Sequence, residues 1–185
     1  MNNTQAIVIT FRPGKQIAPP EKLLLIDLCW GCLVEMPGTV KYCALSYIWG
    51  ELPDSLETRK ENIELLKQNG SITSKSNRSL LPQTVRDAIR LLQSLGQRYL
   101  WVDRLCIIQN DDENKHLNIM RMDSIYSNSY LTIVAADGLD ANHGTSWSSG
   151  RIAPTLRHTM HGQFSARHLG LRITLPRIST KRWDW

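Results

Sequence analysis

Three short apolar segments constrain the fold of this chain more than any other feature. They lie at residues 42–50, 99–108 and 130–136 and are rich in aromatic and β-branched side chains. Runs of this length are typical of buried strands. Between them, apolar residues recur every three or four positions, which predicts helices. Strands that alternate with helices predict an α/β fold with an open, mainly parallel sheet and flanking helices.

Turn and capping residues set the expected limits of the helices. A first helix is expected over residues 56–66 and a second over residues 82–95, and a glycine lies shortly after each. Glycine is common just past a helix end because it adopts the left-handed conformation. Asn110 and Glu113 resemble a capping pair, so a third helix is expected over residues 110–126.

Length and composition narrow the class of protein. A chain of 185 residues suits one domain with a sizeable core. Its longest apolar runs are far shorter than the roughly 20 residues that span a bilayer. The first residues also lack the pattern of a secretion signal. We therefore expect no membrane association and a cytoplasmic protein whose four cysteines are thiols.

The net charge of +5 comes from the C-terminal end of the chain. Residues 151–185 hold seven basic residues and one acid, whereas the rest is nearly neutral. These basic residues are spaced singly and few aromatic side chains lie among them, which argues against nucleic acid as a partner. Binding of other polyanions through this segment stays open as a third function, behind the two described below.

Metal and redox sites have little support in the sequence. Cys29 and Cys32 form a lone Cys-x-x-Cys pair, whereas a zinc site needs four converging ligands. The short stretch after this pair offers too little helix for a thioredoxin-like motif. A phosphate loop and a dinucleotide glycine fingerprint are also missing. We predict no metal and no cofactor, and we interpret the cysteines as structural.

Candidate site residues follow from the expected sheet topology. In an open parallel sheet the ligand crevice lies beyond the carboxyl ends of the strands. This rule selects residues 49–51, 103–109 and 137–138, which follow or end the three predicted strands. Asp103 stands out because an acid in an apolar segment is costly to bury unless it is paired. Both a structural, hydrogen-bonded aspartate and a functional one are consistent with its position.

Four of these segments together resemble a known family. Residues 42–50 (YCALSYIWG), 81–89 (LPQTVRDAI), 95–109 (LGQRYLWVDRLCIIQ) and 125–135 (IYSNSYLTIVA) are similar to the fungal heterokaryon incompatibility (HET) domain. The resemblance implies a cytoplasmic fungal protein of allorecognition and programmed cell death, with the domain as toxic effector. The family is considered remotely similar to Toll/interleukin-receptor (TIR) domains, which implies a TIR- or flavodoxin-like sheet. Some TIR-like effectors cleave NAD, so the resemblance makes NAD the candidate substrate.

The resemblance also divides the chain and exposes departures from the family. We expect an N-terminal extension over residues 1–40, a HET-like core over 41–145, and a basic segment of an incomplete domain over 146–185. Residues 1–40 are consistent with an added strand and lid or with a loose arm. Asn110 and Asn118 stand where the family usually has carboxylates. The family's Trp-x-x-Gln-Glu motif is not completed at the end of the chain, which implies C-terminal truncation.

Two functions are consistent with these observations. One is a cell-death effector that cleaves NAD, and the other is a non-catalytic, TIR-like module that acts through a protein partner or self-association, or a degenerate fragment of one. For the enzyme, a carboxylate must stabilise an oxocarbenium-like centre while the ribose is oriented. The expected catalytic residues are Asp103, Glu113 and Glu51, and the expected ligand-binding residues are Trp49, Gly50, Arg104 and Gln109.

Overall fold

The computed structural model describes residues 7–10, 17–50 and 52–135. The strands are β1 (Ile7–Thr10), β2 (Lys22–Asp27), β3 (Cys32–Pro37), β4 (Cys43–Tyr47), β5 (Tyr99–Val102) and β6 (Leu131–Ala135). The helices are α1 (Ile63–Leu66), α2 (Lys75–Leu80), α3 (Gln83–Ser94), α4 (Asp103–Cys106), α5 (Asp112–Met120) and α6 (Met122–Asn128). The predicted basic segment at residues 146–185 and the turn at residues 137–138 lie outside the described residues.

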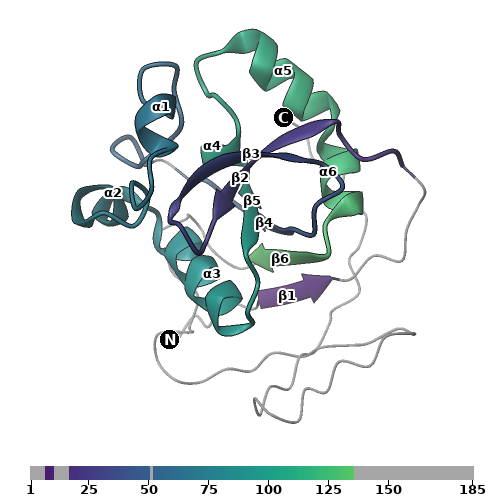
Figure 1. The fold of residues 1–185 in the computed structure, drawn as a ribbon, viewed down its shortest axis with the longest axis horizontal. Helices are drawn as coiled ribbons and strands as arrows, with labels where there is room; N and C mark the ends of the chain where they lie inside the picture. Colours follow the sequence, from purple (N-terminus) through teal and green to yellow (C-terminus); the bar gives the residue numbers. More distant parts are fainter. Residues whose placement is uncertain (1–6, 11–16, 51, 136–185) are drawn as a thin grey trace.

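The described strands form one sheet in the order β1-β6-β4-β5-β2-β3. Its centre is parallel, because β4 pairs in parallel with both β5 and β6. These are the three strands that the sequence predicts. The outer strands are antiparallel, with β1 beside β6, β2 beside β5 and β3 beside β2. In Figure 1 the arrows of β1 and β6 accordingly point in opposite directions.

The sheet is therefore mixed, and the expectation of a mainly parallel sheet is wrong. Only two of the five neighbouring strand pairs among the described residues are parallel. The difference arises in residues 1–40, because β2 and β3 form a hairpin that pairs with β5 and extends the sheet. A hairpin strand needs only a short turn, so its direction does not follow from the helix-linked order of the other strands. The remote TIR-like relationship stays a prediction.

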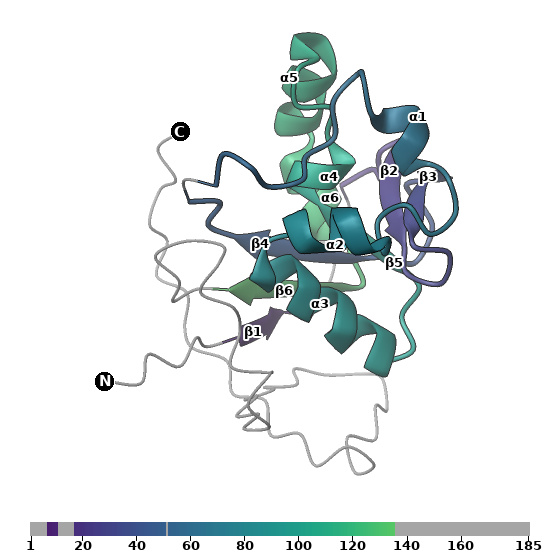
Figure 2. The same ribbon diagram turned by 90° about the vertical axis from the view of Figure 1, so that its left-hand side faces the viewer.

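Helices cover the parallel centre from both sides. In Figure 1, α1, α2 and α3 lie to the left of the sheet and α5 and α6 to its right, and Figure 2 shows α2 and α3 in front of the strands. Helix α3 contacts β4 and β5 and buries Val85, Ala88 and Leu92 along one face. Residues 43–45 of β4 and 100–102 of β5 are completely buried. Strands covered on both faces are expected to be almost continuously apolar, which explains why the sequence predicts them.

The predicted helices are confirmed in part. Helix α3 matches the second prediction, with Gly96 in the left-handed conformation just past its end (φ 65°). The first prediction is too long, because α1 covers only Ile63–Leu66. The third helix is divided at Arg121 into α5 and α6. Its N-cap is Asp111, whose side chain accepts a hydrogen bond from the backbone N–H of Asn114, and not Asn110.

The strand expected over residues 99–108 is shorter than predicted. Strand β5 ends at Val102, and the next four residues form the helical turn α4. Leu105 and Cys106 stay buried in this turn. Periodicity cannot distinguish a short buried helix from a buried strand. Among the described residues, no helix is long and apolar enough to cross a membrane.

Candidate functional site

The carboxyl ends of β4 and β5 bring Trp49 and Asp103 into direct contact. Leu45 lies opposite Val102 in the parallel register, so the residues that follow the two strands leave the sheet at the same edge. The indole Nε1 of Trp49 donates a hydrogen bond of 2.7 Å to Oδ2 of Asp103. The expectation that these two residues meet at one edge of the sheet is therefore confirmed, although they are 54 positions apart in the chain.

Asp103 is a partly buried carboxylate with an unusual pKa. Its Oδ1 accepts a hydrogen bond of 2.7 Å from the backbone N–H of Arg104. Burial raises the pKa of Asp103 from 3.8 to about 6, and the hydrogen bonds from Trp49 and Arg104 offset only part of this effect. Carboxylates with perturbed pKa values in a cleft are candidates for acid–base or electrostatic roles.

Arg104 follows Asp103 but does not form an ion pair with it. Its side chain is only 4% exposed, and its guanidinium lies 4.3 Å from the centroid of the Trp49 ring. One terminal nitrogen donates to the hydroxyl of Ser55. The Nε atom is buried without a hydrogen-bond partner among the described residues. A buried cation that keeps one of its own donors unpaired is costly to the folded protein. The Arg104 guanidinium is therefore suited to bind an anionic group.

Two tyrosines complete the polar cluster of Trp49, Ser55, Asp103 and Arg104. The sequence analysis predicted neither tyrosine as a site residue. The hydroxyl of Tyr47 is buried without a hydrogen-bond partner among the described residues. The hydroxyl of Tyr126 lies 3.4 Å from the Leu45 carbonyl oxygen, to which it donates. Burial raises the pKa of both tyrosines, and the negative charge of Asp103 adds to this. The nearby guanidinium of Arg104 offsets only part of the rise in the pKa of Tyr47, so both stay protonated donors. Tyr47 could have been found, because it lies two residues before Trp49 and strand neighbours alternate faces.

Comparison with known proteins identifies the family. The family model described as heterokaryon incompatibility protein (HET) matches residues 42–182, which is well over half of the chain. The chain belongs to the HET family. The match includes every residue of the polar cluster described above. No solved structure is similar to this chain at a significant level.

One curated protein is similar to part of this HET-family chain. It is the heterokaryon incompatibility protein 6, OR allele, of Neurospora crassa, which is 30% identical over 103 residues. The aligned region is 50% of this chain but only 14% of that protein. The chain therefore spans a small part of the length of this relative, and the similarity by itself does not carry over the activity of the whole relative.

The other predicted site residues have different positions in the HET-family fold. Gly50 is exposed and left-handed (φ 63°), which allows the sharp turn after Trp49. The amide of Gln109 donates to the carbonyl oxygens of Asp103 (2.9 Å) and Ile107 (3.1 Å), so it holds the α4 turn in place. Glu113 is exposed in the first turn of α5, and among the described residues no contact joins it to the cluster. Glu51 lies outside the described residues.

The described residues hold no group of three or more His, Cys, Asp or Glu side chains placed to bind a metal. All four cysteines are free thiols, with Cys29 exposed and the others buried. Cys29 lies in the turn between β2 and β3, and Cys32 is the first residue of β3, so neither lies at the start of a helix. A thioredoxin-like motif needs its cysteine at a helix N-terminus, and this pair does not fit it. Burial instead raises the pKa of Cys32.

Proposed function

We propose that this chain is the effector domain of a cytoplasmic protein of fungal heterokaryon incompatibility, and that it triggers cell death by cleaving NAD at the Trp49–Asp103 edge of the sheet. Family membership and the name of the Neurospora relative support the biological role. The observation that carries the chemistry is the Trp49–Asp103 hydrogen bond. It fixes a carboxylate of raised pKa beside the buried guanidinium of Arg104.

The reaction needs little covalent chemistry from the protein. Hydrolysis breaks the bond between nicotinamide nitrogen and ribose C1′, and neutral nicotinamide leaves with the electron pair. Water attacks the oxocarbenium-like C1′ and releases one proton, which gives ADP-ribose. The ionised Asp103 stabilises the positive charge that develops at C1′ and accepts the proton from water. The site then returns to its starting state when Asp103 loses that proton to solvent.

The other members of the cluster bind and orient the substrate. The unpaired Nε of Arg104 and the hydroxyl of Tyr47 are the donors for a phosphate or ribose oxygen. A guanidinium suits phosphate because its fork of N–H groups matches the oxygens.

The enzymatic proposal is tested by Asp103→Asn in the purified 185-residue chain, with NAD loss and nicotinamide release as readouts. We expect turnover to fall at least about a hundredfold, as for loss of a general base. Asp112→Asn is the matched control, because Asp112 lies in the first turn of α5 away from the cluster. Unchanged turnover in Asp103→Asn would contradict the assignment.

The pH dependence of turnover gives a second readout. Because Asp103 must be ionised to act, turnover should fall as the pH drops below about 6, the pKa that burial gives this carboxyl. A flat profile from pH 5 to pH 8 in a protein that stays folded would assign the chemistry to another group.

A second function has its own support in helix α5. This helix buries none of its residues, and it exposes Leu117 (43%), Ile119 (48%) and Met120 (71%). Exposed apolar side chains that gather on one element are typical of interaction surfaces. The alternative is a non-catalytic module that assembles with itself or a protein partner. Light scattering against concentration, measured together with NAD loss, separates the two, because assembly without turnover supports the module.

A further inference from the structure

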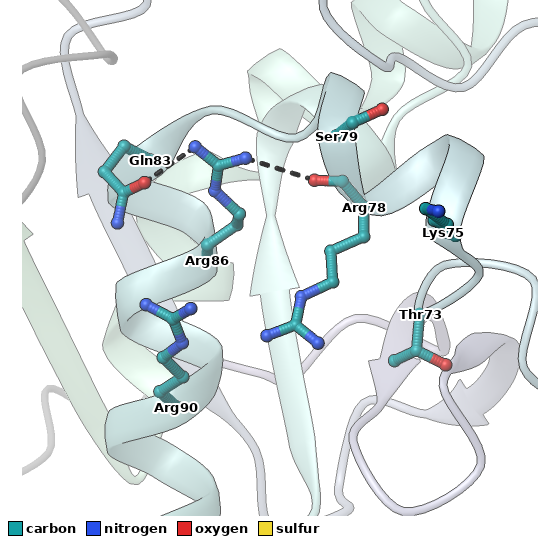
Figure 3. A pocket seen from close by; sticks show the side chains of 7 residues that line it. All are labelled: Thr73, Lys75, Arg78, Ser79, Gln83, Arg86 and Arg90. Carbon is teal, nitrogen blue, oxygen red and sulfur yellow. Dashed lines mark hydrogen bonds between the residues drawn. The ribbon is translucent and has the colours of Figure 1, made fainter.

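A basic hollow lies between α2 and α3 and shares no residue with the Trp49–Asp103 cluster. It has a volume of about 460 Å³. Lys75 and Arg78 reach it from α2, and Arg86 and Arg90 reach it from α3 (Figure 3). The hydroxyl-bearing side chain of Thr73 adds to its lining. Four cations from two helices therefore share a space of the size that small-molecule ligands occupy.

Most of this positive charge is not neutralised by the protein. Arg90 forms an ion pair of 3.3 Å with Asp87, which lies on the same helix. No ion pair among the described residues involves Lys75, Arg78 or Arg86. Like charges that line one hollow repel each other, and an anion between them reduces that cost. Three cations thus remain for a ligand to neutralise.

One of these cations, Arg86, is held in position by neutral groups. The guanidinium of Arg86 donates to Oε1 of Gln83 (2.6 Å) and to the backbone carbonyl of Arg78 (3.3 Å), which ties α3 to α2 (Figure 3). The Ser74 hydroxyl caps α2 by accepting from the backbone N–H of Asn77. Neutral acceptors orient a guanidinium without cancelling its charge. Arg86 is therefore in position before an anion binds, which lowers the entropic cost of binding.

The geometry points to a binding site for a compact polyphosphate anion, meaning two or more linked phosphate groups. One phosphate carries a charge of about −1.5 to −2, which is less than three cations require. Arginine forks and hydroxyl groups are the donors that phosphate oxygens prefer. Among the residues that the structure describes, no aromatic side chain lines the hollow, whereas single-stranded nucleic acid is usually held by stacking on aromatic rings.

The experiment uses inorganic triphosphate as the probe and isothermal titration calorimetry on the 185-residue chain at low and moderate salt. We expect saturable binding that weakens as salt rises. Arg86→Gln should weaken it at least tenfold, and Arg86→Lys should give an intermediate loss because it keeps the charge but loses the fork. Arg121→Gln is the control, since Arg121 is exposed elsewhere in the chain, and it should change affinity less than twofold.

Three results would overturn the proposal. The first is equal weakening by Arg86→Gln and Arg121→Gln, which indicates a general charge effect. The second is tighter binding of a single-stranded oligonucleotide or of a polyglutamate peptide than of triphosphate, which indicates a macromolecular partner. The third is no measurable binding at low salt in a chain with a normal circular dichroism spectrum. Asp103→Asn should leave triphosphate affinity unchanged, so this test is independent of the proposed NAD chemistry.

Discussion

Two carboxylates lie at the two ends of β5, each close to an arginine, and their pKa values move in opposite directions. Asp27 is paired with Tyr99 at the start of β5, and Asp103 directly follows its end. Burial raises the pKa of both side chains. At Asp27, hydrogen bonds from Arg98 and from the backbone of Trp30 and Cys29 outweigh burial and hold the pKa below its ordinary value. At Asp103 burial wins, and the pKa rises to about 6.

The difference lies in where each arginine points. Arg98 donates from Nε to Oδ2 of Asp27 at 2.9 Å, and its Nη2 lies 2.9 Å from the same oxygen, so that the two charges form a closed pair. Arg104 instead directs its guanidinium to Ser55 and to the Trp49 ring. A carboxylate whose charge is fully compensated is a structural element, whereas one left short of partners keeps reactivity at a cost in stability. The comparison therefore assigns a structural role to Asp27, and the open surroundings of Asp103 support the chemistry proposed for it.

The largest effect is expected when the closed pair is broken. Asp27→Asn removes the charge that Arg98 binds and places an N–H₂ group near the donors of the turn. We expect the free energy of unfolding at pH 7 to fall by about 3 kcal/mol, the lower end for a buried ion pair, because Arg98 is about half exposed. Urea denaturation measures it. A loss below about 1 kcal/mol would show that the pair contributes little.

The sequence predicts the surroundings of Asp103 in part, because they follow from the central strands. Three continuous apolar segments predict three neighbouring strands, and the parallel order of β4 and β5 then places Trp49 beside Asp103. The same reasoning does not predict the surroundings of Asp27. The hairpin of β2 and β3 pairs in an antiparallel direction that no pattern in residues 1–40 specifies. Sequence spacing between Asp27 and Arg98 therefore gives no indication that they meet.

Side-chain direction is the other part that the sequence does not predict. The neighbours Asp103 and Arg104 suggest an ion pair, but the α4 turn sends the guanidinium toward Trp49. Ser55 and Tyr126 join the cluster through a loop and a helix whose docking depends on the folded core. Gln109 was expected to bind a ligand because it follows the apolar segment, and its amide is used on backbone carbonyls instead. Such competition between partners is visible only in three dimensions.

The second prediction concerns Asp103, the open carboxylate, whose charge is not closed off by an arginine. Here the substitution is expected to raise the free energy of unfolding. The folded-state pKa of Asp103 is about 6 and its ordinary value is 3.8, so the folded protein binds this proton more tightly between those pH values. Its contribution to stability therefore falls as the pH rises through this window, by up to about 3 kcal/mol. Asp103→Asn cannot lose a proton and should be more stable than the parent at pH 7.

Urea denaturation of both proteins from pH 4 to pH 7 measures this difference. The other carboxylates titrate in both proteins, so subtraction isolates Asp103. At Asp27 the sign is reversed, because a lowered folded-state pKa gives stability that is present above its ordinary pKa and is lost in acid. If the two curves for Asp103 and Asp103→Asn run parallel, burial does not raise the pKa of this carboxyl and the contrast with Asp27 disappears.

A smaller effect is expected when one hydrogen bond to the open carboxylate is removed. Trp49→Phe deletes the Nε1–H donor that lies 2.7 Å from Oδ2 of Asp103 and keeps an aromatic ring over Arg104. Since this bond favours the ionised form, the pKa of Asp103 should rise by about one further unit. A carboxyl-carbon NMR titration gives the value directly.

The control for this variant is the tryptophan near the closed pair. Trp30→Phe changes a ring that lies 5.0 Å from the guanidinium of Arg98, but Asp27 accepts from the backbone N–H of Trp30, which the variant keeps. The pKa values of Asp27 and Asp103 should both stay as in the parent. A rise in the pKa of Asp103 in Trp30→Phe alone would mean that the two ends of β5 are coupled.

The smallest effect is expected at a third carboxylate, which separates pairing from burial. Glu35 lies on the same hairpin as Asp27 and forms an ion pair of 3.1 Å with Lys67, but its side chain is 56% exposed. Exposed pairs usually contribute less than about 1 kcal/mol, and Lys67 keeps Glu64 as a second partner. Glu35→Gln should therefore lower the free energy of unfolding by less than about 0.5 kcal/mol, measured by the same urea denaturation. A loss as large as that of Asp27→Asn would mean that the charge balance of the hairpin, and not the closed geometry around a buried oxygen, stabilises this end of β5.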